Sequence, residues 1–135
     1  MVLKLFYLIS GTLSLLNGIW MILSAYSWFY NLPSGVPDTG AFNGHLIRDL
    51  GLVYFIAGLG FGWSAFNLKN CRVVHIGLTI FFTGHALMHV VDIILERLPH
   101  THWLIDAPLV FAPGIIMFLI ALPVLWKRIN PALSR

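Results

Sequence analysis

Histidines and aspartates at helical spacing are the residues of this chain that could do chemistry. His85, His89 and Asp92 follow at intervals of four and three residues, inside an almost unbroken apolar run from 73 to 95. On a helix these intervals place all three side chains on one face. His45 and Asp49, four residues apart, begin another apolar run. Ionisable groups within apolar runs of this kind usually mark a functional site in a membrane protein.

Imidazole and carboxylate groups without thiolate favour a transition metal ion. Zn, Fe, Mn and Cu(II) accept such ligands, whereas imidazole makes Mg and Ca poor candidates. Haem ligated by two histidines fits less well, because the available histidines are expected at different depths along their helices. The sequence therefore predicts a metal site whose ligands are His45, Asp49, His85, His89 and Asp92.

Further polar residues are expected around that site. Arg48 would supply a counter-charge, and Glu96 and Asp106 would add carboxylates that could orient a ligating imidazole. His100 and His102 could supply a further ligand to the site. They lie in the short connection before the last apolar run, however, which favours a solvated pair of loop histidines.

Four apolar runs would supply the helices that position these residues. They cover about residues 3–29, 46–66, 73–95 and 105–126. About 20 apolar residues, at about 1.5 Å rise each, cross a bilayer as a helix. We therefore predict an all-α fold, a four-helix transmembrane bundle, built from residues 1–135 as a single domain.

The composition agrees with a membrane protein. Hydrophobic residues make up 59% of the chain, charged residues 10%, and the mean hydropathy is +0.86. Such scarce charge excludes a disordered chain and a nucleic-acid binder. The single cysteine, Cys71, can form neither an internal disulfide nor a thiolate metal site.

Basic residues predict the orientation of the spans. Six of the eight lie at the amino terminus, in the second connection and at the carboxyl terminus: Lys4, Lys69, Arg72, Lys127, Arg128 and Arg135. With four spans these three regions share one side, so the positive-inside rule places both termini in the cytoplasm. The predicted metal site then lies near the outer face.

The short second connection predicts that the second and third spans form an antiparallel hairpin. Counting inward along each helix, Asp49 would lie about 6 Å and His89 about 9 Å below the outer boundary. Facing ligands at matched heights are how helix bundles build metal sites. Small residues add a prediction of close helix packing, at Gly11 and Gly18 of the first span and Gly58 and Gly62 of the second.

Two motifs carry a resemblance that covers most of the chain. One is Phe42-Asn43-x-His45-x2-Arg48-Asp49-x-Gly51, and the other is His85-x3-His89-x2-Asp92. With them the chain resembles a group of small bacterial four-span integral membrane proteins. The resemblance implies the four-span fold and the bacterial inner (plasma) membrane, and it implies no particular activity.

Two functional hypotheses follow from these patterns. In the first, the protein handles the metal, or uses it in redox or hydrolytic chemistry, and the sequence leaves open whether it is an enzyme. In the second, it is an accessory or structural subunit of a larger respiratory or monooxygenase complex, or a homo-oligomer. Its histidines and aspartates would then form a buried polar network. Both hypotheses place the protein in a lipid bilayer, and neither includes a nucleic-acid partner.

Overall fold

In the computed structural model, which describes residues 2–130, the chain folds into helices joined by short turns, and this range contains no β-strand. The elements are α1 (Val2–Leu23), α2 (Ala25–Asn31), η1 (Val36–Thr39), α3 (Gly44–Phe66), α4 (Arg72–Ile94), α5 (His102–Ile105), η2 (Ala107–Phe111), α6 (Ala112–Ala121) and α7 (Pro123–Ile129). The predicted all-α class is confirmed. Arg135, one of the basic residues behind the topology prediction, lies outside the described residues.

Three helices, α1, α3 and α4, are long and apolar enough to cross a membrane, and the count is four if a bent pair forms one span. That pair consists of residues 107–121 and α7, which meet at an angle of 85°. The break falls at Leu122, whose ψ of 131° is extended rather than helical. Pro123 explains it, because a proline disfavours the helical conformation of the residue before it.

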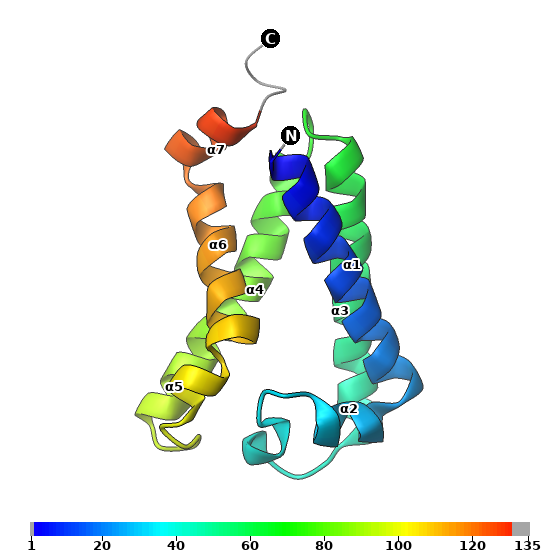
Figure 1. The fold of residues 1–135 in the computed structure, drawn as a ribbon, viewed down its shortest axis with the longest axis vertical. Coiled ribbons are helices and arrows are strands. Elements are labelled where there is room, and N and C mark those ends of the chain that lie inside the picture. The colour runs from blue at the N-terminus through cyan, green and yellow to red at the C-terminus, as the bar shows by residue number, and fades with distance from the viewer. Residues whose placement is uncertain (1, 131–135) are drawn as a thin grey trace.

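The helices form two antiparallel pairs, α1 with α3 and α4 with α6 (Figure 1). The pairs come together at the end that carries both described ends of the chain. They diverge toward the opposite end, where α2, η1 and α5 lie (Figure 1). This divergence decides which polar side chains can meet.

Glycines bring α1 and α3 into close contact. A Cβ added at Gly18 would lie 2.7 Å from the carbonyl oxygen of Gly51, and one at Gly58 would lie 3.0 Å from that of Gly11. The predicted small-residue stripe of α1 therefore packs within the chain, backbone against backbone. At Gly62 only the backbone takes part in the contact: its nitrogen would lie 3.3 Å from a Cβ added at Gly11, whereas a Cβ at Gly62 itself would have no neighbour within 4 Å.

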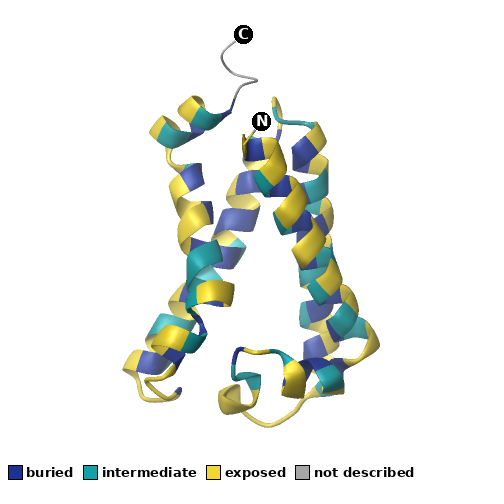
Figure 2. Cartoon of the chain, viewed as in Figure 1, coloured by how far each residue is buried: buried dark blue, intermediate teal, exposed yellow. Residues whose placement is uncertain are grey.

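An apolar core joins the two pairs where they converge. It includes Tyr7 of α1, Phe61 of α3, Phe82 of α4 and Trp126 of α7. His75 is fully buried beside this core, with its ring centroid 5.9 Å from that of Tyr7 and 5.1 Å from that of Trp126. Buried residues follow the facing sides of the helices, as Figure 2 shows. This core closes the converging end of the bundle, while a second apolar cluster that includes Trp28, Phe29 and Ile47 packs α2 against α3 at the diverging end.

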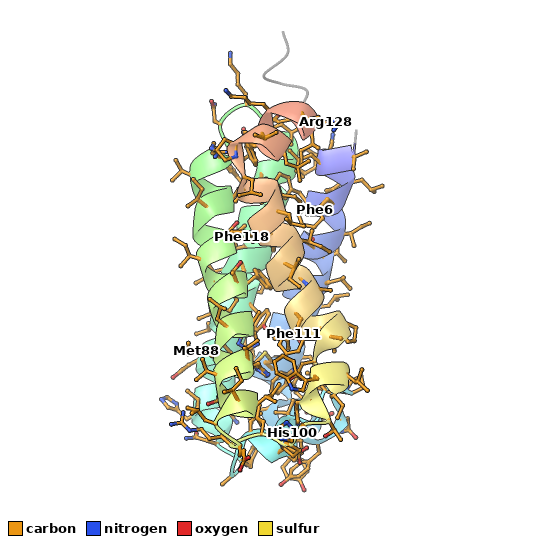
Figure 3. All side chains as sticks on the ribbon, turned by 90° about the vertical axis from the view of Figure 1, so that its left-hand side faces the viewer. Phe6, Met88, His100, Phe111, Phe118 and Arg128 are labelled. Atoms are coloured by element: carbon orange, nitrogen blue, oxygen red, sulfur yellow. The ribbon has the colours of Figure 1, made fainter. Side chains whose placement is uncertain are left out.

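Large hydrophobic side chains cover the outer surface of the helices. Leu23, Val73 and Val124 are among the most exposed, at 79%, 79% and 83%. Figure 3 shows side chains projecting along the whole length of the bundle, from Arg128 at one end to His100 at the other. Exposed apolar surface of this extent marks a face that meets lipid or another protein.

Candidate metal centre

Asp106 stands at the centre of a buried polar cluster in the diverging end of the bundle. Its Oδ2 atom lies 2.8 Å from Nδ1 of His89 and 3.0 Å from Nδ1 of His102. Asp106 and His102 are fully buried, and the His89 side chain is 17% exposed. The donor atoms of these three residues lie within 4.8 Å of one another, which is close enough for one metal ion to bind all three.

The local backbone explains how His102 and Asp106 come together. His102 begins α5 and Asp106 follows one turn later, so both side chains lie on the same side of the turn. The Asp106 carbonyl then accepts hydrogen bonds from the backbone N–H groups of Val110 and Phe111, at 2.8 and 3.0 Å, which opens the wider turn of η2. Wide turns of this type are frequent at functional sites.

Asp38 reaches the same cluster from the other side of the bundle. Its Oδ2 atom lies 3.2 Å from Nε2 of His102, so η1 is tied to α5. A histidine that ligates a metal ordinarily donates its second ring N–H to a carboxylate, which fixes the ring and its tautomer. Asp38 occupies that position for His102.

The number of N–H groups that His102 can offer to its two carboxylate neighbours favours a cation between the buried groups. Its two ring nitrogens face two carboxylates, but a neutral imidazole carries only one N–H. The ring can be a buried imidazolium, it can accept an O–H from one protonated carboxyl group, or it can bind a cation at Nδ1 and donate from Nε2. In addition, Asp106 Oδ1 is buried without a hydrogen-bond partner among the described residues. Such an unpartnered acceptor is costly, and a metal ion would satisfy it.

The donor set suits a transition metal. Two imidazole nitrogens and a carboxylate oxygen are acceptable to Zn, Fe, Mn and Cu(II). Three protein ligands are also the number found at catalytic zinc sites, where a further position stays open for water or substrate.

Of the five ligands expected from the sequence, His89 belongs to this group. His45 and Asp49 instead pair with each other at 3.4 Å, and their side chains are 88% and 58% exposed. Asp92 pairs with Arg97 at 3.2 Å near the surface. His85 lies beside the group, with its ring centroid 4.7 Å from that of His89.

The accessory residues also divide. Asp106, expected only as an accessory carboxylate, lies at the centre of the observed group. Arg48 and Glu96, also expected near the site, are exposed. The expectation that His102 is a solvated loop residue is wrong, since it is fully buried, although its neighbour His100 is exposed.

The divergence of the helix pairs explains these differences. The predicted site was based on residues of α3 and α4 that lie at equal depths along the two helices. That prediction requires the two helices to stay in contact up to the ends that carry these residues. In the structure the segment that contains η1 lies between the diverging ends (Figure 1). A usable signal for the missed ligand was the four-residue spacing of His102 and Asp106, the same spacing as that of His85 and His89.

A cavity of about 700 Å³ adjoins the group of His89, His102 and Asp106. Its walls come from both helix pairs and from the η1 segment, and they are largely apolar, with His85 and His89 among the lining residues. Its aromatic lining residues are Phe6, Trp28, Phe29, Tyr54, Phe61 and Phe82. A second cavity of about 260 Å³ shares His85 and His89 with it and is bordered by Asp92 and Arg97. His85 and His89 are thus accessible from an apolar and a polar side.

No protein-family model, curated protein or solved structure matches this chain. The resemblance to small bacterial four-span membrane proteins stays a prediction. The function is therefore inferred from the geometry of the site.

Proposed function

We propose that this chain is an integral membrane metalloprotein that binds one transition metal ion through His89, His102 and Asp106. The observation that carries the proposal is the buried Asp106 carboxylate, which has imidazole nitrogens at 2.8 and 3.0 Å from one oxygen and no partner for the other. Asp38 supports it by holding the second nitrogen of His102 at 3.2 Å. The protein either handles the metal or uses it in redox or hydrolytic chemistry.

We also propose that the chain crosses the membrane four times, with both termini in the cytoplasm and the metal site toward the outer side. Lys4, the α3–α4 connection with Lys69, and α7 with Lys127 and Arg128 all lie toward the end of the bundle where the described chain begins and ends (Figure 1). The positive-inside rule assigns this end to the cytoplasm. In this topology η2, α6 and the bent α7 form the fourth span.

Each residue of the centre has a distinct part in this proposal. Asp106 supplies the negative charge that offsets a divalent cation, and the two imidazoles supply neutral nitrogen donors. Asp38 orients the His102 ring, and His89 connects the centre to both cavities. When bound, a metal in such a site acts as a Lewis acid or, for Fe or Cu, as a redox centre.

The competing hypothesis is a metal-free polar network in an accessory or structural subunit. The distances of 2.8 and 3.0 Å at Asp106 also fit direct hydrogen bonds, in which case either His102 is an imidazolium between Asp38 and Asp106 or one of these carboxyl groups is protonated. Such a network would hold α4, α5 and η1 together without binding an ion.

Elemental analysis separates the two. The protein should be purified without chelator and its metal content measured against protein concentration by mass spectrometry. The proposal predicts about one transition metal ion per chain, retained in His100→Ala, whose histidine lies outside the centre. A chain that holds no metal after purification, and takes up none of Zn, Fe, Mn or Cu on reconstitution, supports the network instead.

A further inference from the structure

The 700 Å³ cavity has the size and the lining of a small-molecule site. Such sites ordinarily span about 300–1,000 Å³ and are mostly apolar, with a few polar groups that orient the ligand. Aromatic rings from α1, α2, α3 and α4 surround this cavity. Aromatic walls favour a ring-shaped ligand, because rings pack against one another by edge and offset contacts.

His85 is the only imidazole lining the cavity that has no hydrogen-bond partner among the described residues, although hydroxyl groups in the lining (Ser10, Ser14, Ser34 and Tyr54) also have none. Its ring is nearly parallel to that of Phe81, at 9° and 6.4 Å, and meets His89 edge-on, but it forms no hydrogen bond with any described residue. A neutral imidazole offers one donor and one acceptor. In apolar surroundings an unmet donor or acceptor is costly, so a ligand with a hydroxyl or carbonyl oxygen would be favoured there.

The position of the cavity indicates where the ligand comes from. His85 lies 13 residues into α4, which places it about 20 Å from the cytoplasmic end of that helix at the usual helical rise. Exposed Leu13 on α1 and Leu109 on η2 also line the cavity, so it borders the apolar outer surface on both sides. A compound dissolved in the lipid can reach this depth from the apolar side, while the polar cavity bordered by Asp92 and Arg97 gives water access to the same histidines.

We infer that this cavity binds a lipophilic ring compound from the bilayer, with a hydroxyl or carbonyl oxygen of the ring at His85 and the apolar body against the aromatic walls. The inference names the substrate class of the proposed metal centre. It rests on the proposed function for what happens at His89, but not for binding, since the cavity and His85 exist without the metal.

A matched pair of probes tests this inference. 4-Decylphenol carries the ring hydroxyl, and decylbenzene is the same molecule without it. Binding to the full chain in lipid nanodiscs would be followed as the concentration-dependent rise in melting temperature. We expect saturable binding of the phenol, about tenfold tighter than that of decylbenzene, which is the value of one hydrogen bond of about 1.4 kcal/mol.

Variants locate the site. His85→Leu should bring the two probes to equal affinity, because it removes the hydrogen bond and keeps an apolar wall. Ser14→Phe fills the cavity from α1 and should abolish binding of both probes. Leu16→Phe, on the same helix but exposed and outside the cavity, is its control. If Ser14→Phe does not fold, Ala41→Trp in the exposed connection fills the same cavity.

The outcomes separate this inference from the proposed function. Equal affinity of the two probes for the unaltered protein, or undiminished binding in a folded cavity-filling variant, would overturn the inference, and an ordinary lipid chain would then be the occupant. Metal content, measured on the same samples, reports on the proposed function independently. A chain that holds no metal but still binds the phenol more tightly than decylbenzene would contradict the proposed metal binding and support the proposed ligand site.

Discussion

Asp38 and His102 are 64 residues apart in the chain and meet at 3.2 Å, Oδ2 to Nε2, at the diverging end of the bundle. The contact ties the connection before α3 to the turn before α6. It joins the two helix pairs where their helices no longer touch, and it orients one ligand of the proposed metal centre.

Asp38→Asn should weaken metal binding without abolishing it. The amide keeps the size of the side chain but removes the negative charge that holds the His102 N–H. Loss of such a supporting carboxylate typically lowers metal affinity about 10–100-fold. Competition with a chelator of known affinity measures the change. Asp49→Asn, at an exposed carboxylate paired with His45, should retain the original affinity, and an equal loss in both variants would contradict the role of Asp38.

Bound metal should fall as the pH drops below about 6. An imidazole must be neutral to ligate, so protons compete with the metal for both histidines. Any stability that the metal contributes is therefore present at neutral pH and lost on acidification. Dialysis of parallel samples at pH 7.5 and pH 5, followed by metal analysis, tests this. Full retention at pH 5 would show that the histidines are not the ligands.

Gly18→Leu should destabilise the bundle, and Gly62→Leu should have little effect. A side chain at Gly18 would collide with the α3 backbone, whereas one at Gly62 enters open space. Overpacking of this kind costs about 1–3 kcal/mol or more. Thermal unfolding in detergent gives the comparison, and equal melting temperatures of the two variants would show that the α1–α3 contact is looser than described.

The fold was predictable to a large extent, because the apolar runs and their lengths follow from what a bilayer demands of a helix. The packing of Gly11 and Gly18 was predictable for the same reason, since small residues are what close helix contact requires. The break at Leu122 was not, although Pro123 lies beside it. A proline near the end of a span is compatible with a gentle bend as well as with the observed turn of 85°.

The site was harder to predict because it depends on tertiary contacts. His89 was found from its spacing along one helix, which is local information. His102 and Asp106 become buried only because the chain folds back after α4 and the segment with Asp38 closes over them. His45 and Asp49 have the same helical spacing, yet they face outward. Spacing alone cannot tell which pair of helices will diverge.

Single cysteines test the proposed topology. Lys127→Cys and His100→Cys place thiols at exposed positions at opposite ends of the bundle. A membrane-impermeant maleimide applied from outside intact cells should label the second and spare the first. Cys71 is fully buried, and burial raises the pKa of its thiol, so it should remain unlabelled. Labelling of Lys127→Cys from outside would contradict cytoplasmic termini.

The ligand set itself is tested most directly by comparing the metal content of two histidine variants. His102 is fully buried against Asp106, whereas His45 is exposed and pairs with Asp49. Both variants, His102→Ala and His45→Ala, would be purified alongside the unaltered protein, and metal would be measured per folded chain. The account predicts that His102→Ala loses most of its metal and that His45→Ala retains about one ion per chain. Retention in His102→Ala together with loss in His45→Ala would contradict it.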